Sequence, residues 1–167
     1  MKKVSIRRVF FLFLGVLAII LPTAPISSFP TLIETPDYLV CIIFVWLICE
    51  PKSAPFVSIL FLSLLADILW QRPLGLSPLF ILLLTEVIRH SQVKVLNQSI
   101  LLKWVYFVLF LILLDIGINL FSLVAAVPPL DFKVWIKRFL FTIFTFPIVT
   151  ILLEYTVFSQ YKILKKS

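Results

Sequence analysis

The chain has 167 residues, of which 62% are hydrophobic and only 14% are charged. Soluble domains carry about a quarter charged residues, so this composition excludes an ordinary soluble protein and predicts an integral membrane protein. The net charge of +7 does not indicate nucleic-acid binding, because the basic residues stand at the ends of apolar runs and not in a patch with interleaved aromatic residues.

The apolar runs predict an all-α protein with about six short transmembrane helices, in one domain that covers residues 1–167. The first run follows a basic N-terminus that is also typical of a signal peptide. No A-x-A-like cleavage site follows it, so we expect it to be kept as a helix. The predicted spans are Val9–Ala24, Pro36–Cys49, Pro55–Trp70, Leu74–Ile88, Trp104–Val127 and Phe139–Phe158.

The second to fourth segments are shorter than the roughly 17 residues that a spanning helix usually needs. Two interpretations stay open for them. Either the prolines at their starts occupy first helical turns and the bilayer thins locally, or part of this region is re-entrant within the bundle.

The lysines and arginines predict that both termini face the cytoplasm. With the N-terminus inside, eleven of the 15 basic residues fall on the cytoplasmic side, as the positive-inside rule requires. The four on the outer side are Arg72, Lys133, Lys137 and Arg138. No predicted loop has room for a separate soluble domain.

Four acidic residues fall within predicted spans, namely Asp67, Glu86, Asp115 and Glu154. An ionisable side chain near the bilayer centre costs a few kcal/mol, so each needs a partner, a water-filled cavity or a position near an interface. Glu86 shares a helical face with Arg89 and His90, and Glu154 shares one with Lys162. For both we favour interfacial ion pairs over a proton relay.

Asp115 lies near the middle of the fifth predicted span, where Asn119 and Ser122 extend a polar stripe. This stripe must face the bundle interior or another protein. A hydrogen-bonded seam between helices and a path for a solute or ion are both open interpretations. Pro147 is expected to kink the sixth span. The hydroxyls that could hydrogen-bond to Asp115, or to the carbonyl groups freed at this kink, are those of Thr142, Thr145 and Thr150.

Asp67 lies near the outer end of the third span, with Ser63 one turn before it. Arg72 follows closely enough to fold back onto it. Pro73 disfavours helix at the preceding residue and Gly75 permits a sharp turn, so the third and fourth spans are predicted to form a tight hairpin. Asp67 is then either paired with Arg72 to pin this hairpin or a contact for a partner.

The sequence holds no recognisable catalytic or metal-binding set. His90 is the only histidine, and Cys41 and Cys49 are too few for a metal site or a disulfide framework. We find no Ser/His/Asp set, no HExxH motif and no glycine-rich phosphate loop. We therefore predict a protein that is not an enzyme and has no metal and no cofactor.

The chain resembles the rod shape-determining protein MreD family of bacterial inner-membrane proteins. The resemblance covers most of the chain as architecture, and its sharper matches are Pro36-Asp37, Pro51 and the "D-x5-PLG-x3-L" run from Asp67 through Pro73 and Gly75. Ser63 stands where the family pattern has glycine.

The resemblance implies a non-enzymatic, multi-pass scaffold or regulatory subunit of the bacterial cell-elongation complex. Its implied partner is the bitopic protein MreC and, through it, the actin-like MreB, the glycosyltransferase RodA and the penicillin-binding transpeptidase. The family's fold is similar to that of the substrate-binding subunits of energy-coupling-factor transporters. This similarity provides the alternative, a small-molecule-binding membrane subunit of a vitamin transporter.

Overall fold

The computed structural model describes residues 2–23, 36–124 and 132–157, and every regular element within these ranges is helical. This confirms the all-α prediction for the described residues. The six α-helices are α1 (Lys2–Ile20), α2 (Tyr38–Cys49), α3 (Phe56–Leu69), α4 (Leu76–Leu96), α5 (Ile100–Val124) and α6 (Phe132–Thr156). Two short 3₁₀ turns, η1 (Leu21–Thr23) and η2 (Pro51–Ser53), follow α1 and α2.

Within the described ranges, three helical segments are long and apolar enough to cross a membrane, namely Ile6–Thr23, Ile100–Leu123 and Phe132–Thr156. The helices α2 and α3 are apolar but shorter. Large hydrophobic side chains also cover the outside of the bundle, including Val57, Leu83 and Phe144. An apolar exterior of this kind is the surface that lipid solvates, which supports the membrane class inferred from composition.

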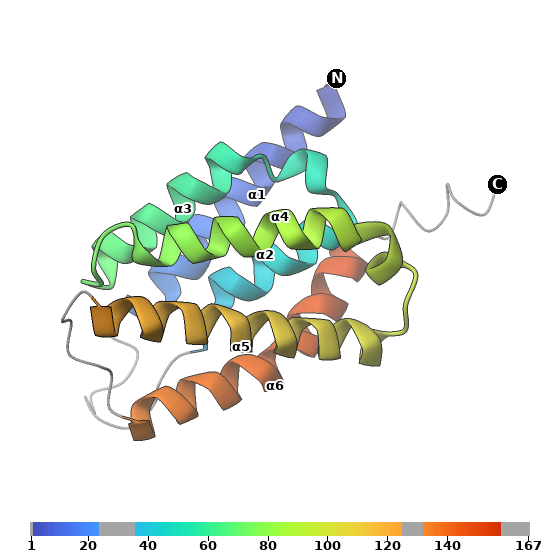
Figure 1. Cartoon of the computed structure of the whole chain (residues 1–167). Helices are drawn as coiled ribbons and strands as arrows, with labels where there is room; N and C mark the ends of the chain where they lie inside the picture. The colour runs from blue at the N-terminus through green and yellow to red at the C-terminus, as the bar shows by residue number, and fades with distance from the viewer. Residues whose placement is uncertain (1, 24–35, 125–131, 158–167) are drawn as a thin grey trace.

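The helices run back and forth between two ends of the bundle (Figure 1). At one end α3 turns into α4, and α2 and α6 begin; we call this the Asp67 end. At the other end α2 turns into α3, and α4 turns into α5; we call this the Glu50 end. Helix α1 starts and α6 finishes at the Glu50 end, so the described chain begins and finishes at the same end.

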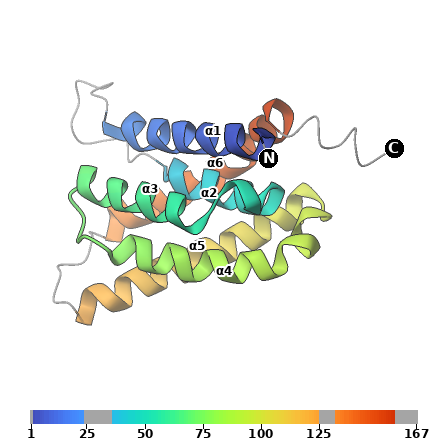
Figure 2. The ribbon, with the colours of Figure 1, turned by 90° about the horizontal axis from the view of Figure 1, so that it is seen from above.

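Helix α2 occupies the centre of the bundle (Figure 2). It contacts α1, α4 and α6, and every side chain from Leu39 to Ile48 is buried. A helix of 12 residues is only about 18 Å long, which is short for a bilayer. Because its neighbours enclose it, α2 does not face lipid, and its length does not have to match the hydrocarbon thickness.

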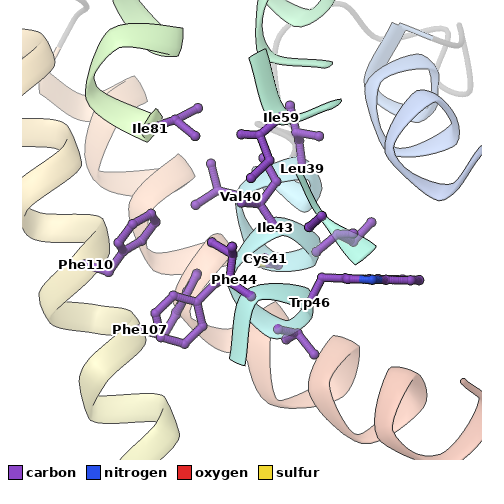
Figure 3. Packing of buried hydrophobic residues seen from close by; sticks show 14 of the residues in the cluster. Leu39, Val40, Cys41, Ile43, Phe44, Trp46, Ile59, Ile81, Phe107 and Phe110 are labelled. Carbon is purple, nitrogen blue, oxygen red and sulfur yellow. The ribbon is translucent and has the colours of Figure 1, made fainter. Parts of the chain in front are cut away.

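Aromatic side chains fill the space around α2. Phe44 of α2 points toward Phe107 and Phe110 of α5, while Trp46 points to the opposite side of the helix (Figure 3). Phe107 stacks on Phe146 of α6 with ring centroids 3.9 Å apart, and Phe44 meets both rings edge-on. These contacts join α2, α5 and α6 in one apolar core.

Several helices extend beyond the predicted apolar spans. Helix α1 begins at Lys2, α4 continues from Ile88 to Leu96, and α6 begins at Phe132. The added turns are rich in basic and polar residues, so hydropathy alone placed them in loops. Ala24, residues 125–127 and Phe158, which belong to predicted spans, lie outside the described residues.

Candidate functional site

The turn between α3 and α4 is built around Asp67 and Gly75. Gly75 has a φ of +88°, a left-handed conformation that glycine adopts without steric cost. This conformation directs its N–H to the Asp67 side chain, with a distance of 3.1 Å from N to Oδ2. The Arg72 N–H donates to the Asp67 carbonyl at 2.9 Å, which closes the turn. The tight hairpin predicted from the sequence is therefore present, and Pro73 lies exposed within it.

Asp67 serves as a helix cap that is supplied from the preceding helix. Its side chain is fully buried and also faces the hydroxyl and the N–H of Ser77, in the first turn of α4. The first N–H groups of a helix lack intrahelical partners and carry partial positive charge, so a carboxylate stabilises them. Ser63, one turn earlier, donates its hydroxyl to the Ile59 carbonyl at 2.8 Å.

Arg72 forms its ion pair with Asp37 and not with Asp67. Its Nη1 lies 3.9 Å from Asp37 Oδ2, just before α2, and its guanidinium stacks over Trp70 at 4.5 Å. Of the two interpretations left open for Asp67, the structure does not favour the pin through Arg72, because the N-terminus of α4 takes the carboxylate. Burial lowers the pKa of Arg72, and the nearby Asp37 opposes this effect.

Asp115 faces the bundle interior and pairs with α6. Its side chain is buried, and its Oδ1 lies 3.6 Å from Arg138 Nη2. The other two residues of the predicted polar stripe hydrogen-bond to carbonyls of their own helix. Asn119 is exposed and donates to the Asp115 carbonyl, and Ser122 donates to the Ile118 carbonyl. Of the predicted stripe, Asp115 alone joins two helices through its side chain in the described structure.

The sequence offered Thr142 as a possible partner of Asp115, but it did not predict that Asp37 and Arg138 belong to this site. The Asp37 N–H donates to Thr142 Oγ1 at 3.0 Å, and this hydroxyl in turn donates to the Arg138 carbonyl. Asp37 lies about 100 positions from Arg138 and Thr142 in the chain, so helical spacing gave no signal for its meeting with them. Asp37 belongs to the Pro-Asp pair at the start of the second predicted span, and that pair was the hint that the sequence gave for Asp37.

A small cavity joins these groups at the Asp67 end. Its volume is about 20 Å³. Its polar lining comes from Asp37, Ser63, Asp67, Arg72, Ser77, Asp115, Arg138 and Thr142. A buried water needs roughly 10–15 Å³, whereas pockets for drug-sized ligands measure about 300–1,000 Å³. The cavity therefore accommodates one or two waters and not a vitamin.

A second set of polar contacts closes the Glu50 end. Glu50 pairs with Arg7 of α1, and Glu154 pairs with Lys103 of α5 at 2.6 Å. Lys162, which was predicted to share a helical face with Glu154, lies outside the described residues. The predicted pairing of Glu86 with Arg89 is present, with 3.3 Å between Arg89 Nε and Glu86 Oε1.

Side chains of α4 also satisfy backbone carbonyls at the Glu50 end. Arg89 donates to the Ala54 carbonyl, and Gln92 donates to the Ile48 carbonyl at 3.3 Å. Ile48 lies in the last turn of α2, whose carbonyls have no intrahelical partner, so Gln92 of α4 satisfies one of them.

The described residues hold no group of three or more His, Cys, Asp or Glu side chains that is arranged to bind a metal ion. Cys41 and Cys49 are both free. The chemistry available at the Asp67 end is consequently electrostatic, since it consists of carboxylates, guanidinium groups and hydroxyls around a small cavity.

Comparisons with known proteins give no relative for this chain. No family model matches it, and neither a curated protein nor a solved structure matches it.

Proposed function

We propose that the protein is a non-enzymatic scaffold of the bacterial cell-elongation complex, which synthesises lateral peptidoglycan. The observation that carries the proposal is the α3–α4 hairpin, in which Asp67 reaches across the turn to Gly75. The spacing of the D-x5-PLG run has a structural reason here, because it sets a carboxylate against the N-terminus of the next helix. This run is also the most specific part of the resemblance to the MreD family.

The proposed location is the bacterial inner membrane, with all six helices crossing and with both termini in the cytoplasm. The Glu50 end would then face the cytoplasm, where most of the basic residues fall. The Asp67 end, with the hairpin and the charged side chains around the cavity, would face outward.

The proposed partner is the transmembrane helix of an MreC-type bitopic protein. Through it the scaffold would meet MreB, RodA and the penicillin-binding transpeptidase. Asn119 is a candidate contact because it is an exposed amide on α5, within a segment that is apolar enough to cross the membrane. Exposed polar side chains of this kind hydrogen-bond to neighbouring transmembrane helices.

The cavity size favours the scaffold over the vitamin-transporter subunit. A vitamin-binding subunit needs a ligand-sized cavity, and the polar groups at the Asp67 end surround only about 20 Å³. The similarity to energy-coupling-factor subunits is implied only by the resemblance to the MreD family. The size of this cavity does not support binding of a vitamin.

The test is affinity purification of the tagged full chain from native membranes, followed by identification of its partners. We expect a bitopic protein and cell-wall synthases to co-purify, and depletion of the chain to abolish rod shape. Asn119→Leu should reduce the recovery of the bitopic partner, whereas Leu109→Ala, which alters an exposed apolar position of α5, should not. Recovery of an ATPase module or of a bound vitamin would overturn the proposal.

A further inference from the structure

The charged groups at the Asp67 end do not balance. Three carboxylates, of Asp37, Asp67 and Asp115, stand against two guanidinium groups, of Arg72 and Arg138. Arg72 interacts electrostatically with all of the other four residues, so they form one set, which we call the charge cluster. Its surplus is one negative charge. An uncompensated charge is costly in an environment that water does not solvate, so the cluster favours uptake of one positive charge.

Two carboxylate oxygens mark where this charge would bind. Oδ1 of Asp67 and Oδ1 of Asp37 are buried and have no hydrogen-bond partner among the described residues. The other oxygen of each carboxylate is engaged, by the Gly75 N–H and by Arg72 respectively. Asp67 is fully buried and Asp37 is 9% exposed. Buried polar atoms normally have a partner, so two such oxygens on one cavity are acceptors available to a bound cation.

The cavity between these side chains limits the size of that occupant. Its volume of about 20 Å³ fits one group the size of a water molecule. Its charge is limited as well, because two guanidinium groups repel a divalent ion. Calcium or a transition metal would bring two or more positive charges against a surplus of one, and the described residues offer no group of three His, Cys, Asp or Glu side chains to balance it.

We propose that this cavity is a binding site for one small monovalent cation, namely Na⁺ or a proton, held by the carboxylates of Asp67 and Asp37. The bound charge neutralises the surplus of the charge cluster and joins the start of α2 to the α3–α4 turn. The site does not depend on the scaffold role, and it is tested on the purified chain without any partner.

The experiment measures thermal unfolding of the full chain in lipid nanodiscs, followed by the fluorescence of its four tryptophans. NaCl is compared with N-methyl-D-glucamine chloride at equal ionic strength, at several values between pH 5 and pH 8. A ligand that binds only the folded state stabilises it by mass action. We expect Na⁺, or lower pH, to raise the midpoint of unfolding by about 2–4 °C.

Variants assign this effect to the charge cluster. Asp67→Asn and Asp37→Asn each remove the surplus charge, so the response to Na⁺ or pH should be lost or shifted at least about tenfold in half-saturating concentration. Glu86→Gln is the matched control. Glu86 is 58% exposed, and it pairs with Arg89 in the part of α4 that leads to the Glu50 end. The variant should respond as the wild type does.

The outcomes separate the two cations and allow the proposal to fail. A response to Na⁺ at constant pH identifies sodium, and a response to pH that Na⁺ does not alter identifies a proton. If Asp67→Asn does not fold, Asp37→Asn and direct binding of radioactive ²²Na⁺ to the wild type replace it. Equal responses to both salts, together with a pH response that the Asp variants retain, would overturn the site.

Discussion

At the scale of single residues, Gly75 sets the geometry of the Asp67 turn. A side chain added at Gly75 would meet no atom within 4 Å, so only its φ of +88° penalises substitution. A left-handed conformation costs a residue with a side chain about 1–2 kcal/mol, and less for asparagine. We therefore expect Gly75→Ala to lower the free energy of unfolding by about 1 kcal/mol. Thermal unfolding measures this, and a smaller loss in Gly75→Asn is the control.

Trp104 compensates for a proline in the neighbouring helix. Pro147 lies inside α6 and has no N–H to donate to the Ile143 carbonyl, four residues earlier. The Trp104 indole N–H of α5 donates to this carbonyl at 3.0 Å. The sequence predicted that Pro147 would leave a carbonyl free, but it pointed to threonine hydroxyls. Thr142 and Thr150 instead donate to the carbonyls of Arg138 and Phe146.

This contact can be measured with a double-mutant cycle. Trp104→Phe removes the donor and leaves the Ile143 carbonyl without it, at an expected cost of about 1–3 kcal/mol in the free energy of unfolding. In a Pro147→Ala background the new backbone N–H reaches the same carbonyl, so Trp104→Phe should cost less there. Equal costs in both backgrounds would show that the indole N–H does not compensate for the proline.

Residue partners were the least predictable part of the site. Arg72 is five positions from Asp67, and sequence distance alone suggested that they pair. The turn instead places Gln71 at a φ of +53° and directs Arg72 toward Asp37, which precedes a different helix. A sequence identifies charges that need partners, but a choice among several partners depends on how the helices pack.

At the scale of helices, two glycines set how closely neighbouring helices approach. A Cβ on Gly15 of α1 would lie 2.4 Å from Leu62 Cδ1 of α3. A Cβ on Gly117 of α5 would lie 2.5 Å from Phe80 Cδ1 of α4. Leu62 can move its methyl groups by a change of rotamer, whereas the Phe80 ring is rigid.

We expect Gly117→Ala to destabilise the protein more than Gly15→Ala. Alanine gains about 1 kcal/mol over glycine in a helix interior, but forcing extra atoms into a packed contact costs about 1–3 kcal/mol. The gain should offset much of the cost at Gly15 and little of it at Gly117. Unfolding midpoints of the two variants test this, with Phe80→Leu expected to relieve Gly117→Ala. A larger loss at Gly15 would contradict the argument.

Hydropathy predicted the existence and order of the six helices but not their environment. Helix α2 was expected to be a short span, and nothing in its uniformly apolar sequence showed that it lies at the centre of the bundle. An apolar sequence of this length is equally compatible with a buried core helix and with part of a re-entrant segment. Its position depends on the five other helices, which a local pattern does not describe.

At the scale of the whole molecule, the buried charged side chains of the described residues lie toward the two ends of the bundle. The charge cluster occupies the Asp67 end, and the pairs of Arg7 with Glu50 and of Lys103 with Glu154 occupy the Glu50 end. This arrangement suits a bundle whose centre lies in hydrocarbon and whose ends reach the interfaces. In the orientation that we propose from the positive-inside rule, the Glu50 end would face the cytoplasm.

Cysteine labelling in intact cells tests this orientation and the crossing of α2 and α3 together. Lys52 is exposed in η2 at the Glu50 end, and Lys133 is exposed near the start of α6 at the Asp67 end. With Cys41 and Cys49 replaced by alanine, a membrane-impermeant maleimide should label Lys133→Cys from outside. It should label Lys52→Cys only after the cells are permeabilised. Labelling of Lys52→Cys in intact cells would mean either an inverted bundle or a re-entrant α2–α3 pair. Lys133→Cys distinguishes these two outcomes, because it loses its label only when the bundle is inverted.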